Sequence, residues 1–195
     1  MRRSLFAVVL LLALAGAAGA DEAVKTPQPV PTPAAPETPI SPSPQQSHIT
    51  SQVYVGERAP DFELDGSSGQ PVKLGHLKGY WVLLVFADRR ADLAPLKAIE
   101  PDLRRLGVRA YGVCADKAHV LGSFVKQKEM ETELLADITG EVSQIYGLYD
   151  SRMRLVRPGF VLIDRQCIVR MALLGQQIPF GEMLGLVKAA VTGAS

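Results

Sequence analysis

The stretch YWVLLVFADRRADLAPLK, residues 80–97, joins an apolar run to a charged turn. The run WVLLVFA is nearly continuous in apolar residues, which is typical of a strand covered on both faces of a sheet. The residues after the turn place apolar side chains at helical spacing. Ligands of open α/β sheets bind at the carboxyl ends of such strands, so we expect a functional site within residues 88–95.

The chain on both sides of this stretch alternates between strand and helix patterns. A turn cluster at residues 65–69 lies between two short alternating runs and predicts a β-hairpin at the start of the domain. Strands are further predicted at 108–115, 133–137, 159–164 and 168–175, and helices at 92–107, 117–129, 140–148 and 179–193. This order predicts an α/β domain of the thioredoxin-like fold, with a central mixed sheet flanked by helices.

Two prolines fall within the first predicted helix, residues 92–107. Pro95 suits the first turn of a helix, whereas Pro101 predicts a kink or a break in its interior. Gly107 is a typical residue to end the helix.

Composition excludes several classes of function. The 195 residues carry a net charge of +1 and no basic block, which argues against nucleic-acid binding. The two cysteines form no Cys-x-x-Cys motif, so neither a cysteine zinc site nor a thioredoxin-type redox pair is predicted. The three histidines are scattered. We therefore expect no metal ion and no cofactor.

The amino terminus has the layout of a secretory signal peptide. Two arginines precede a short apolar stretch, and Ala18-Gly19-Ala20 matches a cleavage site. An uncleaved membrane anchor is the alternative, although the apolar stretch is short for a spanning helix. We predict a signal peptide at 1–20, a disordered Pro-rich linker at 21–52 and one domain at 53–195. The predicted location is outside the cytoplasm, most simply a bacterial periplasm, with no membrane span after cleavage.

Five segments of the domain together resemble one known family. They are VGERAPDFEL at 55–64, VKLGHLKGYWVLLVF at 72–86, VRAYGVCAD at 108–116, LLADITGEVSQIYGL at 134–148 and RPGFVLIDRQCIVR at 157–170. In order and spacing they resemble the peroxiredoxins of the alkyl hydroperoxide reductase and thiol-specific antioxidant group (AhpC/TSA, or redoxins). The resemblance implies the same thioredoxin-like fold.

The sequence departs from this family at the site of chemistry. Peroxiredoxins carry Pro-x-x-x-Thr/Ser-x-x-Cys after the strand that VLLVF resembles, and the cysteine thiolate attacks the peroxide. Aligned without gaps, these positions hold Asp88, Asp92 and Pro95. Neither an aspartate nor a proline forms a sulfenic acid, so the loop resembles a disabled peroxidatic loop.

An arginine of the family pattern is retained. Arg157 matches the distant arginine that stabilises the thiolate in peroxiredoxins, although a simple ion-pair role is equally compatible with its position. We expect Arg89 or Arg90, together with Arg157, to pair with the loop carboxylates. The predicted pocket lining comprises Asp88, Arg89, Arg90, Asp92, Pro95 and Pro158. Thioredoxin-like folds commonly place a cis-proline before the strand predicted at 159–164, and the sequence leaves open whether the peptide bond of Pro158 is cis.

Two cysteines remain as candidates for redox chemistry. Cys114 ends a strand next to the apolar run, where it is either a packed residue or a reactive thiol. Cys167 follows the late hairpin turn, which we expect at the opposite end of the sheet. We therefore predict no intramolecular disulfide, while an intermolecular bridge stays open.

The prediction for function follows from the missing cysteine. We predict an exported peroxiredoxin-like protein without thiol peroxidase activity that acts as a binding or accessory module for a protein or a small molecule. The alternative is an antioxidant thiol oxidoreductase that uses Cys114, with Arg157 in support.

Overall fold

The computed structural model describes residues 53–193. The predicted signal peptide at 1–20 and linker at 21–52 lie outside these residues. No helix between residues 53 and 193 has the length and apolar character needed to cross a membrane.

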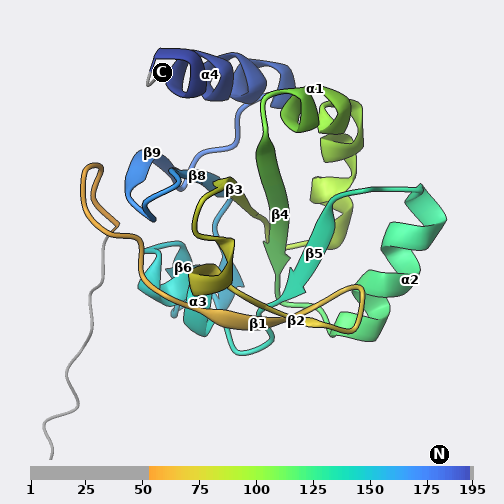
Figure 1. The fold of residues 1–195 in the computed structure, drawn as a ribbon. Helices are drawn as coiled ribbons and strands as arrows, with labels where there is room; N and C mark the ends of the chain where they lie inside the picture. Colours follow the sequence, from red (N-terminus) through yellow and green to blue (C-terminus); the bar gives the residue numbers. More distant parts are fainter. Residues whose placement is uncertain (1–52, 194–195) are drawn as a thin grey trace, which may run out of the picture. The chain divides into compact units, whose positions relative to one another are not determined.

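A seven-stranded mixed sheet forms the centre of the domain (Figure 1). Its order is β2-β1-β5-β4-β3-β8-β9. The strands are β1 (Glu63–Gly66), β2 (Pro71–Lys73), β3 (Trp81–Phe86), β4 (Val108–Cys114), β5 (Glu133–Ala136), β8 (Gly159–Ile163) and β9 (Val169–Leu174). A separate two-stranded ribbon pairs β6 (Tyr149–Asp150) with β7 (Leu155–Val156). The antiparallel hairpin β1–β2 and the late hairpin β8–β9 are both as predicted.

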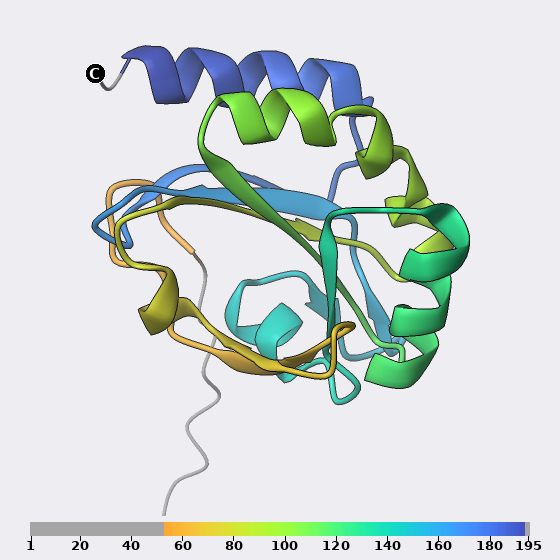
Figure 2. The ribbon, with the colours of Figure 1, turned by 45° about the vertical axis from the view of Figure 1, so that its right-hand side comes forward.

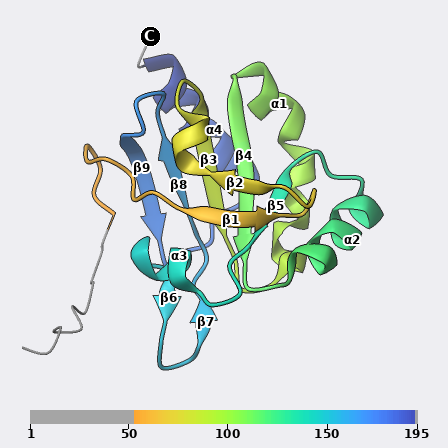
Figure 3. The ribbon, with the colours of Figure 1, turned by 60° about the horizontal axis from the view of Figure 1, so that its bottom comes forward.

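Helices cover both faces of the sheet (Figure 2). They are the 3₁₀ segments η1 (Leu74–Leu77) and η2 (Arg90–Ala98) and the α-helices α1 (Glu100–Arg105), α2 (Ala118–Lys128), α3 (Glu141–Ile145) and α4 (Phe180–Gly193). In Figure 2, α1 and α4 lie above the sheet, while α3 and η1 lie below it. Figure 3 shows the β6–β7 ribbon beside α3, away from α4.

Alternate side chains of β3 divide the core into two clusters. Val82, Leu84 and Phe86 belong to a cluster with Val142 and Tyr146 of α3, which we call the α3-side cluster. Trp81, Leu83 and Val85 belong to a second cluster with side chains of η2, α1, α2 and α4, which we call the α4-side cluster. Every residue of β3 is buried, as expected for a strand covered on both faces.

Strand register brings three strand ends to one point. β3 runs parallel to β4 and antiparallel to β8, with Phe86 opposite Gly159. β9 runs antiparallel to β8, with Gly159 opposite Leu174. The carboxyl ends of β3 and β9 and the amino end of β8 therefore meet at the same edge of the sheet.

The helix predicted over residues 92–107 is divided into η2 and α1. Pro101 stands in the first turn of α1, where its missing N–H costs no hydrogen bond. Of the kink or break expected at Pro101, the structure shows a break, at Ile99 just before α1. Pro95 lies within η2 rather than in a first helical turn, so that expectation was wrong. Gly107, at φ 69°, ends α1 as predicted.

Candidate functional site

A cavity of about 330 Å³ opens where β3, β8 and β9 meet. Its volume is near the lower end of small-molecule sites, which span ~300–1,000 Å³. It is lined by Val85, Phe86, Ala87, Asp88, Arg89, Asp92, Leu93, Pro158, Gly159, Phe160, Gln176, Gln177, Ile178, Phe180 and Met183. The site predicted at the end of the apolar strand is therefore a real hollow in the protein.

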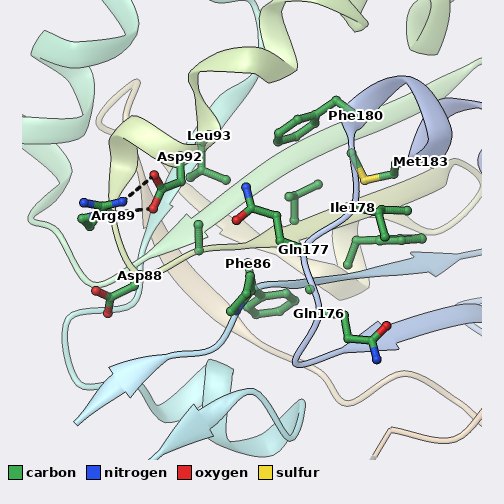
Figure 4. A pocket seen from close by; sticks show the side chains of 15 residues that line it. Phe86, Asp88, Arg89, Asp92, Leu93, Gln176, Gln177, Ile178, Phe180 and Met183 are labelled. Carbon is green, nitrogen blue, oxygen red and sulfur yellow. Dashed lines mark hydrogen bonds and ion pairs between the residues drawn. The ribbon is translucent and has the colours of Figure 1, made fainter. Parts of the chain in front are cut away.

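The lining separates into an apolar interior and a polar margin. Phe86, Leu93, Phe160 and Met183 are buried and apolar. Asp88, Arg89, Gln176 and Gln177 are exposed. Figure 4 shows the charged side chains on one side of the cavity and Ile178, Phe180 and Met183 on the other.

Arg89 and Asp92 form a bidentate ion pair on the charged side of the cavity. The Arg89 Nε and Nη2 atoms donate to the two carboxylate oxygens of Asp92 at 3.1 and 3.0 Å. The hydrogen bond with Asp92 raises the pKa of the Arg89 guanidinium. The expected pairing of Arg89 with a loop carboxylate is present.

Asp88 has a different partner. Its Oδ1 atom accepts a hydrogen bond of 3.2 Å from the backbone N–H of Val156, at the end of β7. Among the described residues no cationic group lies within 4.0 Å of its carboxylate. Asp88 is therefore the one carboxylate of the cavity that has a fixed backbone contact and no ion-pair partner within residues 53–193.

Two arginines that were expected to act at the loop, Arg90 and Arg157, point elsewhere. Arg90 Nη1 donates to Asp116 at 2.9 Å, in a second hollow between η2 and α2. Arg157 Nη2 donates to Asp150 at 2.6 Å, and this bond holds the pKa of the Asp150 carboxyl below its usual value. Each arginine forms an ion pair with a carboxylate outside the cavity. Neither arginine therefore lines the cavity or pairs with Asp88 or Asp92.

Pro95 was also expected in the lining and is absent from it. A 3₁₀ segment has three residues per turn and rises ~2 Å per residue. Arg89, Asp92 and Pro95 consequently follow one face of η2, and Pro95 lies a full turn, ~6 Å, beyond Asp92. The cavity ends before that turn, and Pro95 is exposed.

Pro158 lines the cavity as predicted. Its peptide bond is trans, since residues 53–193 contain no cis bond. The question that the sequence left open for this bond is thereby answered. Pro158 directly precedes Gly159, the first residue of β8, which pairs with Phe86 at the end of β3.

Neither cysteine has access to the cavity. Cys114 is fully buried in the α4-side cluster, and burial raises the pKa of its thiol to about 11. Cys167 is buried in the α3-side cluster, beyond the opposite end of β8. The two thiols are free and lie on different faces and at different ends of the sheet. This geometry agrees with the predicted lack of an intramolecular bridge.

The segment between β9 and α4 was missed by the sequence analysis. It contributes Gln176, Gln177 and Ile178, and α4 adds Phe180 and Met183. The predicted topology could have indicated this segment, because two successive antiparallel pairings, β3 with β8 and β8 with β9, make β9 run in the same direction as β3. The end of β9 must then reach the same edge as the end of β3.

The lining defines which chemistry the cavity supports. It contains no thiol, hydroxyl, imidazole or primary amine among the described residues. No group of three His, Cys, Asp or Glu residues within 53–193 is arranged to hold a metal ion. The side chains present are suited to binding through apolar contact, hydrogen bonds and charge.

Comparison with known sequences identifies relatives of the domain. The AhpC/TSA family matches residues 55–172. A Peroxiredoxin of Thermoplasma volcanium is 30% identical over 132 residues, which cover 60% of this chain and 64% of the relative. Peroxiredoxin-2 of Rattus norvegicus is 28% identical over 161 residues, covering 72% and 80%. The chain spans 64% of the length of the archaeal relative.

Solved structures share the fold. AhpC of Enterococcus faecalis superimposes with a TM-score of 0.66 at 16% identity, over 73% of this chain and 95% of that one. Peroxidoxin BcpB of Mycobacterium tuberculosis gives 0.65 at 18% identity, over 73% and 99%. These likenesses confirm the thioredoxin-like fold predicted from the sequence.

Proposed function

The chain belongs to the AhpC/TSA family, and from that premise we propose that it is a redoxin domain without thiol peroxidase activity that uses its cavity for binding. One observation carries the proposal: the cavity at the end of β3 contains no sulfhydryl group. The proposed role is that of an accessory module for a small molecule or a protein.

The chemistry of the family explains why a thiol matters. A thiolate attacks one oxygen of the hydroperoxide, the O–O bond breaks, and the products are a sulfenic acid and an alcohol or water. The carboxylates of Asp88 and Asp92 cannot form a sulfenic acid. They also place negative charge where a thiolate would develop, which disfavours ionisation of any thiol nearby.

The alternative that Cys114 has taken over the chemistry receives little support. Its side chain has no exposed surface. Burial raises the pKa of this thiol to about 11, so almost none of it is ionised at neutral pH. Arg157, which would have to assist it, is paired with Asp150.

Peroxide consumption tests the proposal directly. We expect the purified protein to consume hydrogen peroxide no faster than its Cys114→Ser/Cys167→Ser variant, and dimedone to leave Cys114 unlabelled. A rate above that variant, abolished by Cys114→Ser alone and accompanied by dimedone labelling, would establish the thiol oxidoreductase instead. Alkylation of the denatured, unreduced protein with iodoacetamide is the control that both cysteines are free thiols before peroxide is added.

We also propose that the protein is exported and loses residues 1–20. The support is the sequence layout of the amino terminus, with a cleavage site before Asp21. Residues 1–52 fused to an alkaline phosphatase lacking its own leader should give activity in a bacterial periplasm, and mass spectrometry should find Asp21 at the mature end. A fusion that stays in the membrane fraction with residues 1–20 intact would support the anchor instead.

A further inference from the structure

We propose that the cavity at the end of β3 takes a small organic cation, an amine attached to an apolar body. This inference rests on the proposed binding function and names the class of ligand. It is carried by two features of the same cavity: an apolar interior closed by α4, and a carboxylate at the margin, Asp88, that forms no ion pair within residues 53–193.

The interior selects an apolar body. Phe160 reaches it from β8, Leu93 from η2, and Phe180 and Met183 from α4. Phe86 lines it from β3, while its ring packs against Tyr146 in the α3-side cluster. Four of these five side chains are buried, and Phe180 is partly buried. Transfer of apolar surface from water into such a site is favourable in proportion to the area removed from solvent. A hydrocarbon chain or an aromatic ring therefore fits this part of the cavity.

The net charge at the margin of the cavity favours a positively charged head group on the ligand. Asp88, Arg89 and Asp92 together carry a net charge of −1, because one guanidinium faces two carboxylates. The Arg89 guanidinium is already held by both oxygens of Asp92. Within residues 53–193 the Asp88 carboxylate accepts one hydrogen bond, from the Val156 N–H, and Arg89 interacts with it only through space, without an ion-pair contact. The uncompensated charge of the cavity is thus located on Asp88.

The surrounding arginines do not cancel that charge. Arg90 is held by Asp116 and Arg157 by Asp150, each within 3.0 Å. An anionic ligand would have to displace Asp92 from Arg89 and would then face Asp88. An ammonium group meets Asp88 without breaking any ion pair that the structure contains.

Gln177 supplies a further polar contact for such a head group. Its side chain extends toward the side of the cavity where Asp92 lies, whereas Gln176 extends in another direction (Figure 4). The amide oxygen of a glutamine accepts hydrogen bonds and an ammonium donates three. The margin therefore offers acceptors of two kinds, a carboxylate and an amide.

Three probes of similar shape test the assignment: 2-phenylethylamine as the cation, 2-phenylethanol as the neutral form and phenylacetate as the anion. Calorimetric titration of the full chain at pH 7 and low salt should give the amine the lowest dissociation constant. We expect it to be lower than that of the alcohol by at least about threefold, the size of a partly exposed ion pair. Phenylacetate should bind more weakly than the alcohol.

Two variants locate the effect. Asp88→Asn should raise the dissociation constant of the amine to that of the alcohol and leave the alcohol unchanged. Asp102→Asn is the matched control, because it removes an equal charge from α1, where Asp102 pairs with Arg105 outside the cavity. Raising the salt concentration should weaken the amine more than the alcohol, and this readout needs no variant.

The outcomes separate this inference from the proposed function. Equal binding of the three probes, preference for phenylacetate, no binding at all, or an unchanged amine affinity in Asp88→Asn would each overturn the cation assignment. A peroxide-inert protein that fails to bind the amine contradicts this inference alone. A protein that binds the amine and also consumes peroxide contradicts the proposed loss of peroxidase activity alone.

Discussion

Cys114 ends β4, the strand next to β3, and is nevertheless isolated from the cavity. Its side chain packs within the α4-side cluster and has no exposed surface. Burial disfavours the thiolate and raises the pKa to about 11 from an ordinary value of 9.0. Cys114, the cysteine that could replace the missing one of the family, is thus held as a protonated, unreactive thiol.

The raised pKa of Cys114 predicts a pH dependence of stability. The folded state binds this proton more tightly than the unfolded state does, so the contribution is complete below pH 9 and is lost as the pH rises through 11. Between pH 8 and 11 the free energy of unfolding of the wild type should fall by about 2 kcal/mol more than that of Cys114→Ala. Urea unfolding at a series of pH values measures the difference, and parallel curves for the two proteins would contradict it.

At the scale of the element, η2 decides what the loop presents to the cavity. Its three-residue turn buries Leu93 and Leu96 together on one face. The neighbouring face carries the Arg89–Asp92 pair at the cavity and Pro95 one turn beyond it. The position that aligns with the family cysteine is therefore displaced from the hollow by the geometry of the segment.

This displacement predicts that restoring the cysteine alone does not restore activity. Pro95→Cys, made in the Cys114→Ser/Cys167→Ser background, should react with hydrogen peroxide no faster than free cysteine. The new thiol would be exposed, would follow Asp92 on one face of η2, and would lack Arg157, which Asp150 holds. A stopped-flow rate well above that of free cysteine would show that residue 95 reaches a competent site.

Asp92→Cys in the same background is the matched comparison, because residue 92 lines the cavity. A bulky alkylating reagent should modify this thiol more slowly than the one at residue 95. The opposite order would contradict the placement of the two residues along η2.

At the scale of the whole domain, a single sheet separates two apolar clusters. β3 supplies Leu84 to the α3-side cluster and Trp81 and Leu83 to the α4-side cluster. Because β3 contributes side chains to both clusters, a mutation in one cluster should also affect the stability of the other. Small domains of this kind generally unfold in one cooperative step.

Leu84→Ala tests whether the two faces unfold together. The leucine is fully buried, so the substitution should lower the free energy of unfolding by about 2–5 kcal/mol. The fluorescence of Trp81, the one tryptophan of the sequence, should report the same midpoint as far-UV circular dichroism. Leu83→Ala, on the tryptophan's own face, is the control. A fluorescence midpoint that stays in place while the dichroism midpoint falls would show that the two faces unfold separately.

The sequence by itself determined the order of the strands of the main sheet and of the larger helices, the thioredoxin-like fold and the edge of the sheet where the site lies, but not η1 or the β6–β7 ribbon. Each depends on local periodicity or on turn residues, such as the apolar run of β3, Gly107 and the break at Pro101. It also identified Asp88, Arg89, Asp92 and Pro158 as lining residues, because they flank strand ends that meet. These features require only that each segment adopt its intrinsic conformation.

Only the tertiary structure decided which groups act together in the cavity. Arg90 and Arg157 were available to the loop, but Asp116 and Asp150 lie closer to them in the folded chain. Pro95 left the lining because η2 is a 3₁₀ segment, and Gln177 and Met183 entered it because two antiparallel pairings bring the end of β9 beside β3. Ion pairs and cavity walls join residues far apart in sequence, and distances of a few ångströms select among them. Such distances are set by register and helical geometry, which the residue pattern of a single segment does not contain.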